Sequence, residues 1–240
     1  MKQLVTPFYS SAIPFETKNS IYRWTKLRYY QLMRALGNGD ALLNSFDDYR
    51  CIFVHIPKTG GISIKRSLFS RSSMPHLSAY DYKVIFGENT YQKYLTFSFV
   101  RNPWDKVLSA YLYLKSDKCT GRDKQWANYN LSGFNEFESF VKHWVNYDNI
   151  YKCVHFIPQH WFICNANLAQ EVNFIGSFEE LEKDFKYIQK QLGLHYNLRH
   201  LNKGNRPRDY KDYYTKETRE IVAQVYRNDI EVFDYSFDQC

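Results

Sequence analysis

Three short apolar runs divide the chain, and each leads into a segment whose apolar positions have helical spacing. The runs cover residues 51–56 (CIFVHI), 95–100 (LTFSFV) and 172–176 (VNFIG). Apolar strands that alternate with helices are typical of a parallel sheet covered by helices on both faces. The pattern therefore predicts an α/β fold, in which ligands bind at the carboxyl ends of the strands, where loops lead into helix N-termini.

Helical periodicity predicts further elements around this sheet. Residues 20–36 carry apolar positions at helical spacing and end at the Gly-Asn-Gly sequence of residues 37–39. A capping box formed by Ser177 and Glu180 predicts a helix over about 178–192, which Gly193 can end.

Two more segments complete the outline. Residues 116–170 are interpreted as an insertion, in which a loop rich in polar and aromatic residues precedes a helix near 133–145. Residues 215–233 predict one last helix, whose acidic start at Glu217 suits the helix dipole. The length allows a sizeable core, so we expect a single domain over 50–240 that contains the insertion. An N-terminal helical extension, residues 1–49, is expected to pack on it.

The first strand ends in a turn suited to binding an anion. The sequence KTGG at residues 58–61 follows the strand and precedes a helix predicted from about Ile62. The first N–H groups of a helix are unpaired, glycines allow close approach of the backbone, and Lys58 adds a mobile charge. Because the lysine precedes the glycines, the order differs from the GxxxxGK[ST] loop, which disfavours an NTPase. A tight turn beside an exposed lysine is the alternative interpretation.

The second strand ends in a similarly suggestive motif. Arg101 ends the strand, Asn102 can cap the following helix, and Pro103 suits its first turn. Ser109 lies two turns into this helix, on the side from which its hydroxyl could join Arg101 around a phosphate. Two anion sites on neighbouring strands indicate a ligand with two separated phosphate-like groups. The alternative is a surface ion pair at Arg101 and an ordinary helix residue at Ser109.

Composition changes this picture only slightly. The 240 residues include 32 Lys and Arg against 25 Asp and Glu, and the net charge of +7 suits an anionic ligand without distinguishing its class. Five cysteines at scattered spacings form neither a zinc motif nor a dense disulfide framework, so reduced thiols are expected. The sequence shows no signal-peptide core and no bilayer-spanning apolar run. We expect a cytoplasmic protein, with peripheral contact at the inner membrane face as an alternative.

Taken together, these motifs resemble those of the carbohydrate sulfotransferases that use 3′-phosphoadenosine 5′-phosphosulfate (PAPS), especially bacterial relatives of the heparan, dermatan and chondroitin sulfotransferases. HIPKTGGISI looks like the 5′-phosphosulfate loop of that family, and FVRNPWDKVLSAY looks like its 3′-phosphate motif, RNPxxRxxSxY. The similarity continues through FIGSFEELEKDF and LNKGNRPRDYKDYYTKETREIVAQVYRNDIEVFDYSF, and so covers about residues 50 to 237. The resemblance implies the P-loop-like parallel sheet of a sulfotransferase domain.

The resemblance also implies roles for the matching residues, with two departures. Ile62 stands where the family often has threonine, so only its backbone N–H remains for the ligand. Lys106 replaces the second arginine of RNPxxR, which keeps the charge but loses bidentate geometry, and a weaker hold on the cofactor is expected. The implied cofactor contacts are Lys58, Thr59, Gly60, Gly61, Ile62 and Ser63 for the phosphosulfate, Arg101 and Ser109 for the 3′-phosphate, and Asn202, Lys203 and Arg206 in a late loop that closes over the nucleotide.

Sulfuryl transfer needs a base for the acceptor hydroxyl and stabilisation of charge on the leaving phosphate. Lys58 suits the second role, and no metal is expected. The resemblance points to a histidine between the two motifs as the base, which here is His76, although an exposed loop histidine is the alternative. His55 is expected to be buried and structural. His160 is the second choice as base or acceptor contact, and Glu88 is an acidic fallback.

The expected acceptor is a glycan hydroxyl, on an acidic polysaccharide or a membrane-linked glycolipid precursor. Trp126 and Tyr129, placed in the polar loop of the insertion, are candidates to stack on the sugar. No nucleic-acid partner is expected. Two other functions remain open: phosphoryl transfer, which would need a Mg²⁺ ligand and an ordered Walker loop that the sequence does not show, and a basic module that binds RNA or another polyanion.

Overall fold

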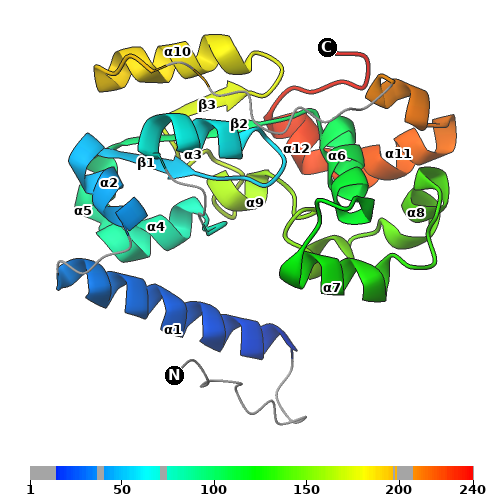
Figure 1. Ribbon diagram of the computed structural model, residues 1–240, viewed down its shortest axis with the longest axis horizontal. Coiled ribbons are helices and arrows are strands. Elements are labelled where there is room, and N and C mark those ends of the chain that lie inside the picture. The colour runs from blue at the N-terminus through cyan, green and yellow to red at the C-terminus, as the bar shows by residue number, and fades with distance from the viewer. Residues whose placement is uncertain (1–14, 37–40, 71–74, 197, 199–207, 240) are drawn as a thin grey trace.

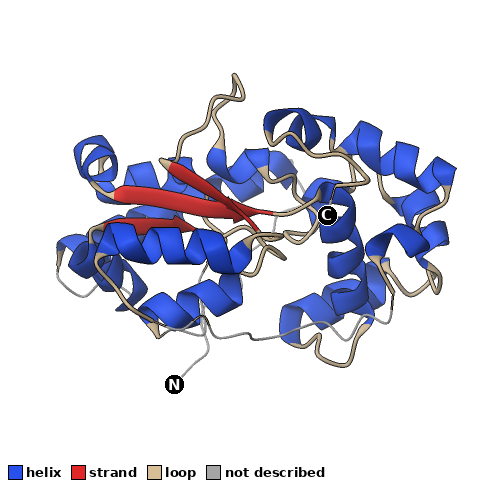
Figure 2. Ribbon diagram, turned by 90° about the horizontal axis from the view of Figure 1, so that it is seen from above, coloured by secondary structure: helices blue, strands red, loops and turns tan. Residues whose placement is uncertain are grey.

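The computed structural model describes residues 15–36, 41–70, 75–196, 198 and 208–239. Helices surround a three-stranded sheet at one end of the molecule and pack on one another at the other end (Figures 1 and 2). Up to the central strand the elements are α1 (Phe15–Ala35), α2 (Ala41–Tyr49), β1 (Cys51–Val54), α3 (Gly61–Phe69), α4 (Ala79–Phe86), α5 (Glu88–Lys93) and β2 (Leu95–Val100). The remaining elements are α6 (Pro103–Lys115), α7 (Gly121–Asn130), α8 (Phe137–Trp144), η1 (Ile150–Lys152), α9 (His160–Ile163), β3 (Phe174–Ser177), α10 (Leu181–Leu192), η2 (Tyr210–Tyr213), α11 (Lys216–Val225) and α12 (Arg227–Val232).

The three strands are parallel, and β2 is the central one. In the register, Phe97 of β2 pairs with Phe53 of β1 and with Phe174 of β3. Every residue of β1 is buried, as expected for a strand covered on both faces. Figure 1 shows α10 on one side of the sheet and α4 on the other. The predicted α/β fold with a parallel sheet flanked by helices is confirmed, and it brings the turns after β1 and β2 to the same edge.

The predicted capping box before α10 is wrong. Ser177 belongs to β3, the helix begins at Leu181, and Glu180 at the N-cap position makes no side-chain cap. The Ser177 oxygen accepts instead from the backbone N–H of Glu179 at 3.1 Å, and its hydroxyl donates to the carboxylate of Glu179, so the serine side chain closes a turn before the helix. The predicted end of the helix at Gly193 is confirmed, with φ of 65° in the left-handed region that favours glycine.

Two predictions for the helical half also need correction. The polar loop expected at the start of the insertion is largely helix α7, on which Trp126 packs edge-on against Trp144 of α8 at a ring-centroid distance of 5.6 Å. The single C-terminal helix is divided at Tyr226 into α11 and α12. Tyr226 is fully buried and its hydroxyl donates to the carbonyl of Phe156 at 2.6 Å, which ties the break to the insertion.

Two clusters of buried apolar side chains hold the elements together. The sheet core joins β1 and β2 to side chains of α2 to α5 and α10, while the helical core joins α6, α7, α8 and α11. Fully buried members include Phe53, Phe97 and Tyr82 in the sheet core and Phe140, Phe156 and Tyr226 in the helical core.

Helix α1 lies at the edge of the molecule and packs on α4 (Figure 1). Leu27 is its buried apolar contact with the sheet core. Arg23 donates to Asp81 through Nε at 2.7 Å and to Ser78 through Nη2 at 3.0 Å. Ser78 and Asp81 form the capping box that begins α4, so α1 is attached at that helix start. Within the described ranges, no helix has both the length and the apolar character needed to cross a membrane.

Candidate active site

The turn between β1 and α3 is held by contacts of its own residues. Thr59 is fully buried, and its hydroxyl donates to the carbonyl of Ile56 at 3.0 Å. Lys58 and Gly60 have φ of 71° and 80°, and Gly60 is the N-cap of α3. Helix α3 therefore begins directly at the turn, where the unpaired N–H groups and positive end of a helix favour an anion.

Packing within the protein itself requires Gly61. A Cβ at this position would lie only 1.9 Å from Cδ2 of His55, so no side chain fits. At Gly60 the left-handed backbone already favours glycine. From the sequence, both glycines are expected to allow close approach of a ligand. The structure gives a reason within the protein for each: the left-handed backbone at Gly60 and the His55 ring beside Gly61.

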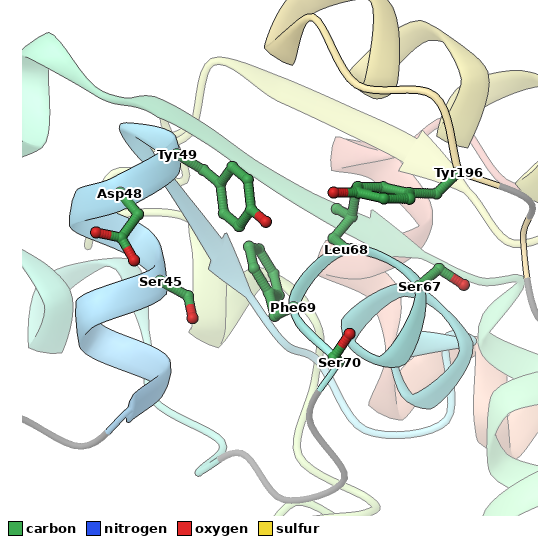
Figure 3. A pocket seen from close by; sticks show the side chains of 8 residues that line it. All are labelled: Ser45, Asp48, Tyr49, Ser67, Leu68, Phe69, Ser70 and Tyr196. Atoms are coloured by element: carbon green, nitrogen blue, oxygen red, sulfur yellow. The ribbon is translucent and has the colours of Figure 1, made fainter.

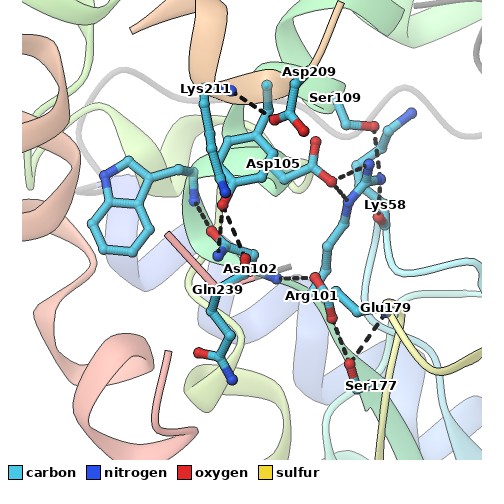
Figure 4. Close-up of polar contacts among 12 residues, drawn as sticks. Lys58, Arg101, Asn102, Asp105, Ser109, Ser177, Glu179, Asp209, Lys211 and Gln239 are labelled. Carbon is cyan, nitrogen blue, oxygen red and sulfur yellow. Dashed lines mark hydrogen bonds and ion pairs between the residues drawn. The ribbon is translucent and has the colours of Figure 1, made fainter. Parts of the chain in front are cut away.

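Arg101, at the end of β2, lies against the turn after β1 (Figure 4). Its Nη1 donates to the backbone carbonyl of Lys58 at 3.0 Å and to Oγ of Ser109 at 3.2 Å. Nε and Nη2 contact Oδ2 of Asp105 at 2.8 and 2.7 Å, and the guanidinium lies over the ring of Phe178 at 4.0 Å. The structure thus places the Arg101 guanidinium between the backbone of Lys58 and the hydroxyl of Ser109.

The backbone at Arg101 is held from a distant part of the chain. The side-chain amide of Gln159 accepts from Arg101 N at 2.9 Å and donates to Arg101 O at 2.8 Å. The buried carboxylate of Asp229 in turn accepts from the backbone N–H groups of Gln159 and His160. His160 Nδ1 also contacts this carboxylate at 2.6 Å, so the side chain proposed as an acceptor contact is held by α12.

The ammonium of Lys58 lies over the ring of Tyr113, at 4.2 Å from the ring centroid. Burial is the main cause that lowers the pKa of Lys58 to about 8, and the charge of Arg101 lowers it further. A lysine in this state remains largely protonated at neutral pH but can lose its proton just above it. A bound phosphate would favour the protonated form.

His76 is positioned as a neutral imidazole. Its Nδ1 lies 3.0 Å from the backbone carbonyl of His55, and a carbonyl oxygen can only accept, so Nδ1 carries the proton. Nε2 is then left with a lone pair that can take up a proton. Burial is the main cause that lowers the pKa of His76 to about 4. The imidazole is therefore uncharged at neutral pH, as a base for a hydroxyl requires.

His55 matches the structural role expected from the sequence. It is 4% exposed, its ring stacks on Phe53, and it lies 4.5 Å from the ring of His76 between centroids. Burial holds its pKa well below the ordinary value, so the ring stays neutral. His55 thus contacts the site twice: its ring packs against Gly61, and its backbone carbonyl accepts from His76 Nδ1.

Lys106, which replaces an arginine of the family motif, is fully buried. Its Nζ donates to the backbone carbonyls of His155 and Ile157 at 3.3 and 2.9 Å. Burial is the main cause that lowers its pKa to about 8. The ammonium therefore anchors the segment that carries these carbonyls, and three donors on a flexible stem suit this task without the planar fork of arginine.

Sequence reasoning missed three side chains next to this site: Tyr113 on α6, Asp123 on α7 and His155. Asp123 Oδ2 accepts from the Tyr113 hydroxyl and lies within 3.0 Å of His155 Nε2. The His155 ring is 6.4 Å from the ring of His76. No sequence motif links these three positions, because they come from different elements and meet only in the folded protein.

The other predicted residues are dispersed. Ser63 is buried on α3, and Ile62 beside it is 37% exposed. Trp126 is partly buried in the helical core, whereas Tyr129 on the same helix is 87% exposed. The late-loop residues predicted to close over the nucleotide lie outside the described part of the chain: Asn202, Lys203 and Arg206.

A surface hollow lies away from these two motifs. A cavity of about 570 Å³ lies at the C-terminal end of α3, opposite the end that follows the turn of residues 58–61 (Figure 3). Hydroxyl and aromatic side chains from α2, α3 and the segment after α10 surround it. Its lining consists of Ser45, Asp48, Tyr49, Ser67, Leu68, Phe69, Ser70 and Tyr196.

The donors at the ends of β1 and β2 fit a ligand with two phosphate-like groups. They comprise the ammonium of Lys58, the guanidinium of Arg101, the hydroxyl of Ser109 and the N-terminus of α3. In the regions that the structure describes, no three His, Cys, Asp or Glu side chains are grouped so that they could hold a metal ion.

Comparisons with known proteins show which family the chain resembles. A sequence model of the sulfotransferase family matches residues 43–236, which include both motifs and His76. An uncharacterized protein of Archaeoglobus fulgidus is 40% identical over 110 residues, which make up 45% of this chain and 75% of that protein. No solved structure matches the chain. Because the family model covers most of the sequence, the chain belongs to the sulfotransferase family.

Proposed function

We propose that this protein transfers the sulfuryl group of PAPS to a hydroxyl of a carbohydrate acceptor. Family membership supports sulfuryl transfer in general. The observation that carries the proposal is the pair of bonds from Arg101 to the Lys58 carbonyl and the Ser109 hydroxyl, which unites two cationic motifs at one place. A nucleotide with phosphate groups at its 3′ and 5′ positions matches two adjacent anion sites.

PAPS supplies an activated sulfuryl group on a nucleotide 5′-phosphate. The turn before α3 would hold that end of the nucleotide through backbone N–H groups and the Lys58 ammonium. Lys58 would also stabilise the negative charge left on the 5′-phosphate, and low accessibility strengthens that interaction. Arg101 would bind the 3′-phosphate with Ser109, because Asp105 already fixes the orientation of its guanidinium.

His76 is the proposed base. Its Nδ1–H is engaged with the His55 carbonyl, so Nε2 is the atom that would accept the proton of the acceptor hydroxyl. The imidazolium formed in this way would keep its hydrogen bond to the carbonyl, which stabilises it.

The acceptor is proposed to be a carbohydrate, and the insertion is its proposed binding surface. Tyr129 presents an 87% exposed ring on α7, and aromatic rings offer sugars a flat apolar surface. Trp126, the other aromatic candidate, is partly buried against Trp144 and would contribute only its accessible edge.

Thermal unfolding with candidate ligands tests the nucleotide part of the proposal. The desulfated product of the donor, 3′-phosphoadenosine 5′-phosphate (PAP), should stabilise the protein by about 2.7 kcal/mol at a hundredfold excess over its dissociation constant. ATP with Mg²⁺ should have a much smaller effect, because it lacks a 3′-phosphate for Arg101. Stabilisation by RNA or ATP without stabilisation by PAP would instead support a polyanion-binding module or a phosphoryl transferase.

The variant His76→Gln tests the assignment of the base. Glutamine keeps a polar side chain of similar size but cannot take up the proton, so sulfuryl transfer from radiolabelled PAPS to a panel of glycans should be lost. The stabilisation by PAP should remain close to that of the unmodified protein, because His76 does not belong to the phosphate sites. Full transfer activity in the variant would contradict the assignment.

A further inference from the structure

One carboxylate in the insertion bonds two side chains whose rings contact the groups that the proposed reaction uses. Asp123, in the first turn of α7, accepts at Oδ2 from His155 Nε2 and from the Tyr113 hydroxyl, each at 3.0 Å. The hydrogen bond with His155 is the main cause that lowers the pKa of Asp123, which is therefore ionised. Burial raises the pKa of Tyr113, which remains a protonated donor.

The first branch leads from Asp123 to His76. An ionised carboxylate can only accept, so His155 must carry a proton on Nε2. His155 is 8% exposed, and its Nδ1 has no hydrogen-bond partner among the described residues. Its ring meets that of His76 nearly at right angles, at 75° and 6.4 Å between centroids. An unpaired buried polar atom is costly, so its presence in the ring next to the proposed base calls for an explanation.

The second branch leads from Asp123 to Lys58. The hydroxyl of Tyr113 is bound by Asp123, and the face of the same ring lies under the Lys58 ammonium at 4.2 Å. The Tyr113 ring also packs edge-on against His155 at 5.1 Å. The carboxylate thus fixes the surface on which the lysine rests, and a cation gains from a fixed aromatic face.

We propose that Asp123 is a positioning residue that holds the base His76, through His155, and the cation Lys58, through Tyr113, in one arrangement. This inference rests on the proposed function, because that function gives His76 and Lys58 their roles. It assigns to α7 a part in the reaction in addition to carrying a surface for the acceptor. In this arrangement the buried, unpaired Nδ1 belongs to the ring that contacts the ring of His76.

The negative charge of Asp123 raises the pKa of both Lys58 and His76. Among the charged groups that face Lys58, Arg101 and Lys106 oppose its protonated form while Asp123 and Cys119 favour it. Around His76, the side chains of His155 and Lys65 oppose protonation, whereas Asp123 and the hydrogen bond to the His55 carbonyl favour it. Removing this single charge should therefore move the protonation of both groups to lower pH.

The test is the variant Asp123→Asn, which keeps the volume and removes the charge. The bell-shaped pH profile of kcat/KM should shift to lower pH on both limbs by about one unit, the scale of a single nearby charge. A readout without substrate is the ¹³Cε resonance of Lys58, whose pKa should fall by a similar amount. The resonance of His155 Nε2 should also shift, because its carboxylate acceptor is replaced by an amide. Unchanged Lys58 and His155 signals would overturn the proposal.

Matched variants separate the two branches and control for the fold. Tyr113→Phe keeps the ring but releases it from the carboxylate, so it should move only the alkaline limb, while His155→Gln should move only the acid limb. Asp148→Asn removes the same charge from an exposed site in the insertion and should shift neither limb. If the unmodified protein transfers no sulfuryl group, the proposed function fails, whereas the resonances of Lys58 and His155 still decide the role of Asp123.

Discussion

Lys58 combines three features that rarely occur together in a lysine. Its backbone lies in the left-handed region, with φ of 71°, which costs about 1 kcal/mol for a residue with a Cβ. Its ammonium rests on the ring of Tyr113, and its pKa is lowered to about 8. The protein therefore maintains a strained, partly desolvated cation next to Arg101, and this arrangement becomes favourable once an anion is bound.

Binding of PAP should consequently depend on pH through Lys58. Above about pH 8 the unbound lysine has lost its proton, and the bound phosphate requires that proton back, so the affinity should fall by up to about tenfold per pH unit. Below that pH the lysine is already charged, and the affinity should be level. Calorimetry at about pH 7 and about pH 9 in buffers of different ionisation enthalpy would measure both the affinity and the proton uptake.

Lys58→Arg is the control for this prediction, because a guanidinium stays charged over the whole range. Its affinity for PAP should be independent of pH even if it is lower throughout. An affinity of the unmodified protein that stays constant up to about pH 9, with no proton uptake, would show that Lys58 does not touch the nucleotide.

At the scale of single elements, Asn102 connects the start of α6 to the C-terminal segment. Its side chain accepts from Trp104 N at 3.1 Å as the N-cap of the helix, and its Nδ2 donates to Tyr210 and to the carbonyl of Ser236. Its backbone N–H also donates to Glu179. A residue predicted only as a helix cap therefore also joins β2 to three later segments.

Asn102→Ala should lower the free energy of unfolding by about 2–4 kcal/mol, because it removes a cap and leaves buried polar partners unpaired. Asn102→Ser retains a capping hydroxyl but no amide donors, so it should fall between the alanine variant and the unmodified protein. Urea unfolding measures both. Equal losses in the two variants would mean that the cap itself contributes nothing.

Local sequence signals identified the elements better than their ends. The strands, α1 and the Asn102 cap were predictable because apolar spacing and capping chemistry act within a few residues. The capping box at Ser177 is wrong because the serine side chain bonds the backbone N–H and the carboxylate of Glu179, before the helix begins at Leu181. The sequence of α7, GRDKQWANYN, predicts a loop because it has little apolar periodicity. The contact of Trp126 with Trp144, which helps to stabilise the helix, forms only in the tertiary fold.

At the scale of the whole molecule, the candidate site lies between the sheet core and the helical core. Lys58, His55 and His76 belong to the sheet side, while Tyr113 and His155 come from the helical side. The sequence could place Lys58 and Arg101 together because parallel strands end at the same edge. It could not place Asp123 or His155, since these approach only when the two cores pack against each other.

Helix α1 lies at the edge of the molecule, yet it is attached next to the proposed base. Arg23 clamps Ser78 and Asp81 at the start of α4, two residues beyond His76, and its guanidinium stacks on Trp161 at 4.7 Å. The segment bearing the imidazole is thus pinned at one side by the His55 carbonyl and at the other by an arginine from outside the sheet. An outlying helix of this kind acts as a brace: we expect a chain without it still to bind the proposed nucleotide but to hold the imidazole of His76 less firmly.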